Sequence, residues 1–304
     1  MVTPSVSWPA RTLAILRRAA DLRSAVGHWR RSGATVGLVP TMGALHDGHL
    51  ELVRRAQVEC DRVVTTLFVN PKQFDRAEDL DRYPRDEAAD AHRLERHGVD
   101  LLYAPDVAEI YPAGFVSKVS LPDLTDCLCG AARPGHMDGV ATVVAKLLLQ
   151  SLPDRAYFGE KDFQQLVMIQ QMVRDLDIPV TIVGVPTVRE ADGLALSSRN
   201  VLLSAEARQR ATLLYRVLSR LAVELADGQR EAAPLLAEGV RQLAQAGFDP
   251  IDYLELREPR ALRLLARADR PARLFAAAFL DGVRLIDNLP VIPGPVAVSR
   301  PGCE

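Results

Sequence analysis

The chain of 304 residues lacks the usual marks of a membrane or secreted protein. No apolar run reaches the roughly 18 residues that a membrane-spanning helix requires. Residues Met1–Pro9 contain neither a charged start nor a long apolar core, so no secretory signal peptide is visible. We therefore expect a protein of the cytoplasm.

Cysteine is scarce, with four residues in the whole chain. Two of them form the C-x-C pair Cys127 and Cys129, which lacks the two-plus-two ligand spacing of a structural zinc site. Histidines could complete such a site, but free and partly buried thiols are the simpler interpretation. The sequence gives this pair no role.

An excess of charge of one sign is also absent, because the formal net charge is −2 and no basic tail occurs. This balance argues against nucleic acid or an anionic membrane as the main partner. Of the 37 basic residues four are lysines, namely Lys72, Lys118, Lys146 and Lys161. A lysine inside a motif is therefore more informative here than in a protein that uses lysine freely.

Several catalytic and nucleotide-binding motifs are missing as well. No G-x-x-x-x-G-K-[ST] sequence is present, so the chain is not a P-loop protein. No G-x-G-x-x-G follows a predicted strand, which argues against a nicotinamide dinucleotide. The absence of G-x-S-x-G and H-E-x-x-H leaves covalent serine catalysis and zinc hydrolysis without support.

The stretch Val39–Leu50 places two histidines between a predicted strand and a predicted helix. The apolar run Thr35–Val39 precedes it, and the amphipathic segment Leu50–Ala56 follows it. His46 and His49 are three residues apart, so both rings lie on one face if the helix begins near His46. The N–H groups and the positive dipole end of a helix N-terminus can bind an anion there. Such a pair also occurs in ordinary turns, so the functional interpretation depends on the flanking strand and helix.

Short apolar strands alternate with helical segments over the first part of the chain. We predict strands at 12–16, 35–39, 62–69, 100–104, 155–158 and 179–185, and helices at 19–31, 50–56, 85–97, 139–152 and 163–176. The alternation predicts an α/β fold, with a parallel sheet that carries helices on both faces. We expect mixed strand and loop over 102–121, and a loop over 126–138.

Polar motifs follow four of these strands: the histidine turn, residues 70–73, residues 159–162 and a segment after 185. Ligands of parallel sheets bind at the carboxyl ends of the strands, so these motifs are expected to form one site.

The pattern changes after about residue 187, where strands and helices no longer alternate. Two long helices at 204–226 and 230–246 are followed by strands at 251–257, 273–279 and 283–287. We therefore predict a first domain over 1–186, a smaller α+β domain over 187–290, and a loosely ordered tail that begins at Pro290 and takes in 291–304.

A nucleoside triphosphate lying across the strand ends would meet these polar groups. Gly43 and Gly48 would let the backbone approach a phosphate where a Cβ would block it. Lys161 could bring a full charge to the α-phosphate, and the segment Ser197–Arg199 could add a hydroxyl and a planar guanidinium. Each has an ordinary alternative, since Lys161 could be an exposed turn residue and Ser197–Arg199 could cap the next helix.

Several longer motifs together resemble those of one enzyme family. They are Met42–His49 (MGALHDGH), Phe68–Phe74 (FVNPKQF), Tyr83–Arg85 (YPR), Phe158–Asp162 (FGEKD) with Gln164 and Gln165, and Gly193–Asn200 (GLALSSRN). In this order and spacing they resemble the pantothenate synthetases, or pantoate–β-alanine ligases, of the His-x-Gly-His nucleotidyltransferase superfamily. The resemblance covers about residues 12 to 289. Two departures do not disturb it: Leu196 stands where the family usually has Met, and Lys72 fills a variable position.

The resemblance implies ATP-dependent joining of pantoate and β-alanine to pantothenate through a pantoyl adenylate, with release of AMP and pyrophosphate. It also implies a Rossmann-like first domain, a C-terminal lid, a homodimer, and Mg²⁺ on the ATP. Two alternatives remain at this point. One is another nucleotidyltransferase of the superfamily, and the other is an ATP-binding module without catalysis.

The resemblance also assigns roles to residues. It places ATP against Met42, Gly43, Ala44, Leu45, His46, Asp47, Gly48, His49, Gly159, Glu160, Lys161, Asp162, Val188, Leu196, Ser197, Ser198 and Arg199. His46, His49, Lys161 and Arg199 would be catalytic, with His49 matching the residue that the family treats as a proton donor. Gln73, Gln165 and Asn70 would hold the substrates, and Asp90 is the nearest match to an acidic residue close to Mg²⁺.

Overall fold

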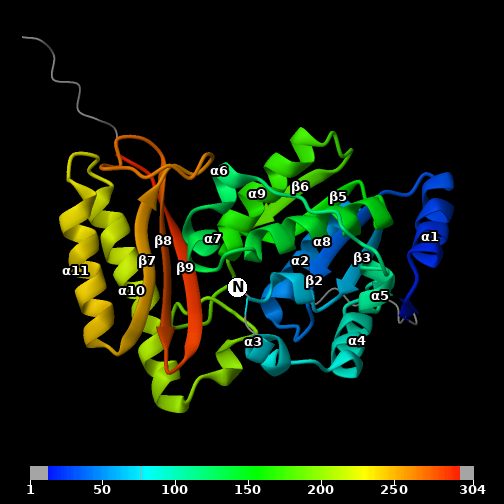
Figure 1. Ribbon diagram of the computed structural model, residues 1–304, viewed down its shortest axis with the longest axis horizontal. Helices are drawn as coiled ribbons and strands as arrows, with labels where there is room; N and C mark the ends of the chain where they lie inside the picture. Colours follow the sequence, from blue (N-terminus) through cyan, green and yellow to red (C-terminus); the bar gives the residue numbers. More distant parts are fainter. Residues whose placement is uncertain (1–12, 76, 295–304) are drawn as a thin grey trace, which may run out of the picture. The chain divides into compact units, whose positions relative to one another are not determined.

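The computed structural model describes residues 13–75 and 77–294 (Figure 1). The predictions for the first twelve residues and for the tail beyond residue 294 lie outside the described residues. Contacts divide the chain into two compact units. The first unit comprises the described residues up to Val188 together with Leu196–Ser198, and the second comprises Arg189–Ala195 and the described residues from Arg199 onward.

A six-stranded parallel sheet forms the centre of the first unit. Its strands are β1 (Ala14–Leu16), β2 (Val36–Thr41), β3 (Arg62–Leu67), β4 (Leu101–Tyr103), β5 (Arg155–Gly159) and β6 (Thr181–Val185). They lie in the order β1-β4-β3-β2-β5-β6, and every neighbouring pair is parallel. The predicted parallel sheet is therefore confirmed, with β1 at one edge. Because β2 has β3 on one side and β5 on the other, the chain changes direction across the sheet at β2.

Alternate residues of the strands face two different cores. In β2, Val36 and Leu38 belong to one hydrophobic cluster, and Val39 belongs to another. The same alternation separates Leu101 from Leu102 in β4. Successive side chains of a strand point to opposite faces, so the sheet is buried on both sides and its strands are apolar throughout.

Helices cover both faces, as the sequence predicts. Helices α1 (Ala19–Arg31), α8 (His136–Ser151) and α9 (Phe163–Asp175) contribute to the first cluster, whereas α2 (Asp47–Glu59) and α4 (Glu87–Arg96) contribute to the second. Short segments connect them: η1 (Pro71–Gln73), α3 (Ala77–Arg82), α5 (Val107–Ile110), α6 (Pro122–Thr125), α7 (Leu128–Ala132) and η2 (Glu160–Asp162). In the described ranges, no helix combines the length and apolar character that crossing a bilayer requires.

The second unit is an antiparallel sheet backed by two helices. Strands β7 (Phe248–Arg257), β8 (Ala272–Leu280) and β9 (Val283–Val291) pair in that order. Helices α10 (Ala205–Leu225) and α11 (Ala232–Gln245) lie on one face of this sheet (Figure 1). The short η3 (Asn200–Leu202) precedes α10. The expected α+β arrangement is present, while a function of this unit as a lid stays a prediction.

Three local predictions were wrong. The expected loop over 126–138 contains α7 and the start of α8, where Gly130 allows tight packing because a Cβ would lie 1.4 Å from the Thr125 carbonyl oxygen. The expected strand content over 102–121 ends with β4 at Tyr103, and α5 follows. Pro290 and Val291 are part of β9 rather than of a loose tail, since Val291 pairs with β8 and is 1% exposed.

Candidate functional site

The turn Met42–His46 leads from the carboxyl end of β2 into α2. His46 is the N-cap residue of α2, and its Nδ1 accepts a hydrogen bond from the Gly48 N–H at 3.1 Å. The His46 N–H in turn donates to His49 Nδ1 at 3.3 Å. The two ring centroids are 4.1 Å apart, so the predicted placement of both rings on one side of the helix start is confirmed.

These backbone contacts fix the protonation of both rings. A backbone N–H can only donate, so each Nδ1 is an acceptor and each neutral ring carries its proton on Nε2. Burial lowers the pKa of His46 to about 4 and that of His49 to about 3, and the positive charge of Lys161 contributes to both shifts. Near neutral pH both side chains are therefore uncharged and carry an Nε2–H donor.

The two glycines are needed for the packing of the turn, while their predicted role in letting a phosphate approach stays a prediction. The Gly43 N–H donates to Thr41 Oγ1 at 3.3 Å, and the Gly48 N–H is bonded to His46. Gly43 has a φ of +89°, and a Cβ on Gly48 would lie 2.9 Å from the His46 ring. Glycine is thus required by the packing of the turn itself.

Asp90 from α4 holds the same turn in place. Its two carboxylate oxygens accept hydrogen bonds from the Ala44 and Leu45 N–H groups, both at 2.8 Å. Arg93, one turn further along α4, donates to the Leu45 carbonyl oxygen. Burial raises the pKa of Asp90, which is 5% exposed, against the lowering effect of these hydrogen bonds. Sequence reasoning missed this contact, because 45 residues or more separate its partners.

A metal ion bound mainly by protein side chains does not fit this site. Among residues 13–75 and 77–294, no group of three or more His, Cys, Asp or Glu side chains could hold one. Both Asp90 oxygens are engaged by the turn. A Mg²⁺ ion would therefore depend on the phosphates of a nucleotide for its ligands, as this ion commonly does.

Residues from further along the chain also reach the turn. The Leu196 N–H donates to the Val188 carbonyl oxygen at 3.0 Å, and Ser198 Oγ donates to the Ala44 carbonyl oxygen at 3.0 Å. The structure thus brings Val188, Leu196 and Ser198 together with the histidine turn, and Ser197 lies in the same segment of the first unit. Arg199 begins the next part of the chain, in the second unit.

The segment Gly159–Asp162 lies at the carboxyl end of β5, at the same edge of the sheet. Gly159 is the last residue of β5, and residues Glu160–Asp162 form η2. The side chain of Lys161 is 18% exposed and lies 3.8 Å from an oxygen of Asp162. Its charge acts on both histidine rings, so the predicted lysine and the two histidines face the same region.

Asn70 and Gln73 form a tight turn after β3. Asn70 is 1% exposed, and its Nδ2 donates to Gln73 Oε1 at 3.0 Å. Gln73 Nε2 approaches Met42 Sδ at 3.0 Å, so the end of β3 meets the histidine turn. His136 Nδ1 lies 2.6 Å from the Gln73 carbonyl oxygen. Gly139 permits the close approach of α8 to the Asn70–Gln73 turn, because a Cβ there would lie 2.2 Å from the Lys72 carbonyl oxygen.

Two adjacent glutamines of α9 differ in their surroundings. Gln165, predicted to hold substrate, is half-buried. Gln164 is buried, and its amide accepts from the Cys129 N–H at 3.0 Å and donates to the Cys127 carbonyl oxygen at 2.8 Å. Gln164 therefore fixes the segment that contains both cysteines, whose side chains are thiols rather than halves of a disulfide. The family resemblance assigned a substrate role to Gln165 alone, so the structural role of Gln164 was missed.

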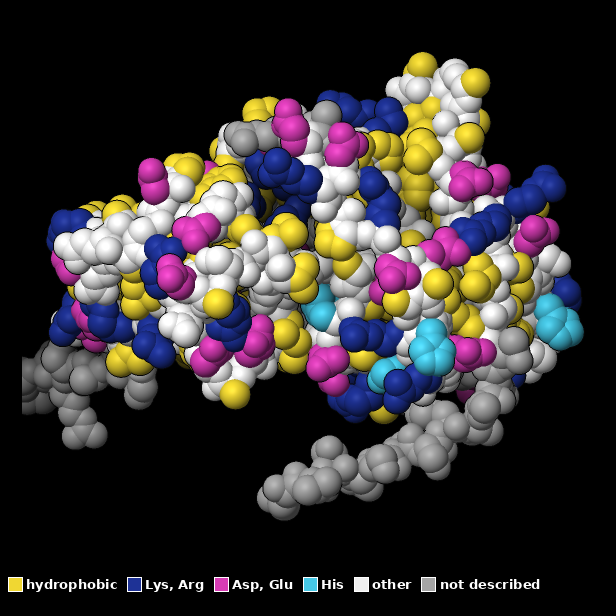
Figure 2. All heavy atoms as spheres, turned by 90° about the horizontal axis from the view of Figure 1, so that it is seen from below, with side chains coloured by type: hydrophobic (Ala, Val, Ile, Leu, Met, Phe, Trp, Pro, Cys, Tyr) yellow, Lys and Arg dark blue, Asp and Glu magenta, His cyan; other side chains and the backbone are white. Residues whose placement is uncertain are grey.

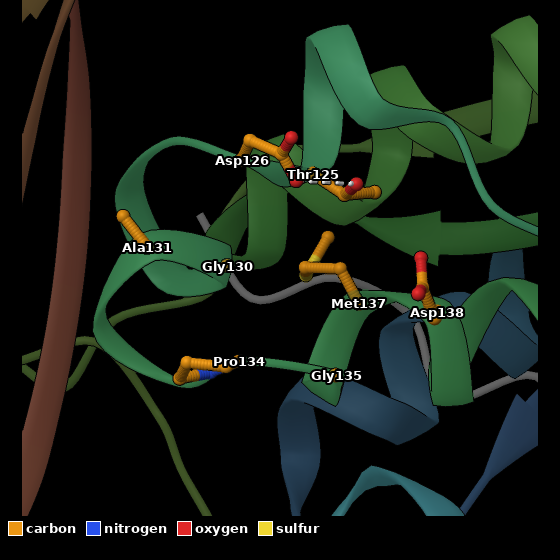
Figure 3. A pocket seen from close by; sticks show the side chains of 8 residues that line it. All are labelled: Thr125, Asp126, Gly130, Ala131, Pro134, Gly135, Met137 and Asp138. Carbon is orange, nitrogen blue, oxygen red and sulfur yellow. Dashed lines mark hydrogen bonds between the residues drawn. The ribbon is translucent and has the colours of Figure 1, made fainter.

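A pocket of about 300 Å³ lies between the α6–α7 segment and the start of α8 (Figure 3). Its lining consists of Thr125, Asp126, Gly130, Ala131, Pro134, Gly135, Met137 and Asp138. None of these residues is among those that the family resemblance assigns to ATP or to the substrates. On the face shown in Figure 2, Lys and Arg side chains are interspersed with Asp and Glu side chains.

Comparison with known proteins gives consistent results. Residues 14–290 match the family model described as pantoate-beta-alanine ligase. The pantothenate synthetase of Roseobacter denitrificans is 57% identical over 286 residues, which cover 94% of this chain and 99% of that protein. The enzyme of Ruegeria pomeroyi is 58% identical over 278 residues, covering 91% and 97%.

Solved structures agree with this result. The pantothenate synthetase of Thermus thermophilus has a TM-score of 0.86 and 49% identity, and the match covers 92% of this chain and 100% of that one. A pantoate-beta-alanine ligase of Francisella tularensis, complexed with beta-gamma ATP and beta-alanine, has a TM-score of 0.78 and 33% identity over 91% and 97% of the two chains. Both the fold and the ligase resemblance are confirmed, and the alternative assignments are set aside. The chain belongs to the pantoate–β-alanine ligase family.

Proposed function

We propose that the strand-end residues of the first unit carry out the family's reaction, the ATP-dependent ligation of pantoate and β-alanine to pantothenate. The observation that supports this most directly is the pair of neutral imidazoles, 4.1 Å apart, whose Nε2–H groups are donors. The charge of Lys161 acts on both rings. Two fixed donors and one cation suit the phosphate groups of ATP.

In the first step, the carboxylate of pantoate attacks the α-phosphorus of ATP. A new P–O bond forms, the bond to the leaving pyrophosphate breaks, and pyrophosphate takes the electron pair. The carboxylate is already ionised near neutral pH, so this step needs no general base. Catalysis comes from positioning and from donors that stabilise the phosphoryl oxygens, which are the roles proposed for His46, His49, Lys161 and Arg199.

In the second step, the free amine of β-alanine attacks the carbonyl carbon of the pantoyl adenylate. The C–N bond forms, the bond to AMP breaks with its electron pair leaving on AMP, and the proton that the amine loses passes to solvent water. Gln73 and Gln165 are neutral, so they can bind carboxylate and hydroxyl groups without adding charge to the site. Asn70 has all its hydrogen-bonding groups engaged within the protein, which supports an indirect role for it.

Four further features are proposed on the strength of the family resemblance. Mg²⁺ accompanies ATP and is held by its phosphates, the chain forms a homodimer, and the enzyme works in the cytoplasm. The second unit is proposed to act as a lid that carries Arg199. Light scattering of the purified protein tests the dimer directly, because a mass close to the 33.3 kDa of one chain would contradict it.

A pyrophosphate-release assay with ATP, Mg²⁺ and pantoate, with and without β-alanine, tests the reaction. We expect one equivalent of pyrophosphate per enzyme with pantoate alone, and sustained release with pantothenate and AMP when β-alanine is present. Release that required a phosphorylated acceptor in place of pantoate would contradict the proposal. It would also remove the substrate roles of Gln73 and Gln165.

A further inference from the structure

The side chain of Asn70 makes four hydrogen bonds inside the first unit. Its Oδ1 accepts from the Tyr111 hydroxyl at 2.8 Å and from the Lys72 N–H at 3.3 Å. Its Nδ2 donates to Gln73 Oε1 at 3.0 Å and to the Gly139 carbonyl oxygen at 3.1 Å. Two acceptor sites and two donor sites are the full capacity of a side-chain amide, so this buried group is completely satisfied.

This arrangement determines which way round both amides lie. The Gly139 carbonyl oxygen can only accept and the Lys72 N–H can only donate, so Asn70 must direct Nδ2 to the former and Oδ1 to the latter. Because Asn70 Nδ2 is a donor, the Gln73 atom that it contacts must be an acceptor, and this atom is Oε1. The NH₂ group of Gln73 is consequently the end that points to Met42 and the histidine turn.

Tyr111 supplies the hydroxyl that donates to Asn70, which in turn donates to Gln73. Its ring lies on the loop after α5, with centroids 6.2 Å from Phe68 and 5.1 Å from Phe115. Lys72 Nζ lies 5.1 Å from the Tyr111 ring centroid. These contacts hold the ring in one position. Burial raises the pKa of the hydroxyl to about 12, so it keeps its proton and can donate at any physiological pH.

We propose that Tyr111 is a positioning residue, whose hydroxyl adds to the two backbone contacts that orient Asn70 and so helps to present the NH₂ group of Gln73 to an oxygen of the bound substrate. A presented NH₂ group selects a ligand that offers a carboxylate or hydroxyl oxygen, and it rejects a ligand that offers a donor at that point. This inference depends on the proposed role of Gln73 in holding pantoate or β-alanine. The inference adds Tyr111, which lies well beyond Gln73 in the sequence and belongs to none of the motifs that carry the family resemblance.

The test compares two tyrosines whose hydroxyls each donate to a side-chain amide oxygen. Tyr103 is fully buried and its hydroxyl also donates to a side-chain amide oxygen, that of Gln150, at 3.2 Å. Tyr111→Phe and Tyr103→Phe therefore each remove one hydroxyl from one amide. We expect Tyr111→Phe to weaken pantoate binding roughly five- to tenfold, measured by calorimetry in the presence of a non-hydrolysable ATP analogue, while Tyr103→Phe changes it less than about twofold. Melting curves of both variants show whether the fold is retained.

A double-mutant cycle with Gln73→Ala separates positioning from a general effect on structure. If Tyr111 acts through Gln73, Tyr111→Phe has no further effect on pantoate binding once Gln73 is Ala. An equal loss in both backgrounds, or equal losses for Tyr111→Phe and Tyr103→Phe, would overturn the inference. If Gln73→Ala itself leaves the binding of both substrates unchanged, the proposed role of Gln73 fails, and the role of Tyr111 fails with it. If Gln73→Ala weakens binding and Tyr111→Phe does not, only the role of Tyr111 is wrong.

Discussion

Asp90 offers a sharp test of how the histidine turn is held. The change Asp90→Asn keeps the shape of the side chain but leaves one oxygen to accept, where the carboxylate has two. One of the Ala44 and Leu45 N–H groups, now 2.8 Å from a carboxylate oxygen, would face an NH₂ group instead. The site is buried, so water cannot replace the lost acceptor.

The size of the effect follows from these contacts. Losing one hydrogen bond to a charged acceptor and leaving one buried donor unsatisfied costs about 3 kcal/mol. For a domain of about 200 residues this corresponds to a fall in Tm of roughly 6 to 12 °C. The turn also positions both histidines, so we expect ATP to bind at least roughly fivefold more weakly.

The assay combines a melting curve with an ATP titration at several Mg²⁺ concentrations. Asp86→Asn is the matched control, because Asp86 lies on the surface at the start of the same helix and accepts from the Ala89 N–H at 2.9 Å. Asn caps a helix as well as Asp, so this control should change neither quantity. An unchanged Tm for Asp90→Asn, together with a raised Mg²⁺ requirement, would refute the turn-holding role and favour a metal ligand.

Three other predictions concern the proposed catalytic groups. Lys161→Ala should slow adenylate formation at least roughly 10²-fold, as loss of one charge-stabilising donor does elsewhere; near wild-type single-turnover rates would exclude this role. His46→Ala and His49→Ala should each slow adenylation more than the amine step, and stopped-flow traces in which only the second step slows would contradict that. The folded-state pKa values of about 4 and about 3 lie below the unfolded value of 6.5, so the unfolded chain binds more protons between these limits. The two rings therefore contribute stability that is complete above pH 6.5 and is lost as the pH falls towards 4 and 3. NMR titration of the ring signals checks this, and a midpoint near 6.5 for either ring would be inconsistent with it.

The sequence predicted those features that depend on local patterns. Strands that are buried on both faces, such as β4 with Leu101 and Leu102, are continuous apolar runs in the sequence. At the histidine turn the spacing of apolar residues changes from that of a strand, β2, to that of a helix, α2. The short α7 was missed, because Gly130 and Pro134 are typical of loops while the actual packing needs a glycine inside a helix. Propensity is a weak guide wherever tertiary contacts decide the conformation.

The supporting contacts of the site could not be predicted in the same way. Asp90 reaches back across 45 residues to the turn, and Tyr111 reaches back across 41 residues to Asn70. No sequence pattern predicts either of these separations along the chain, because each depends on which strand ends lie side by side in the fold. The family resemblance named Asn70 and Gln73, but it did not show that their two side-chain amides are hydrogen-bonded to each other. The direction of those amides needed the three-dimensional partners.

The strand order of the first unit also bears on how the chain folds during synthesis. Strands β2, β3 and β4 are consecutive neighbours, so they can pair as soon as the chain has been made as far as Tyr103. The other side of β2 pairs with β5, where Gly37 meets Arg155 from much later in the chain. Until then an apolar strand edge is open to wrong partners, and such distant pairing is slow. Premature termination before β5 should therefore give an aggregating fragment, and the nascent chain is expected to need protection over this interval.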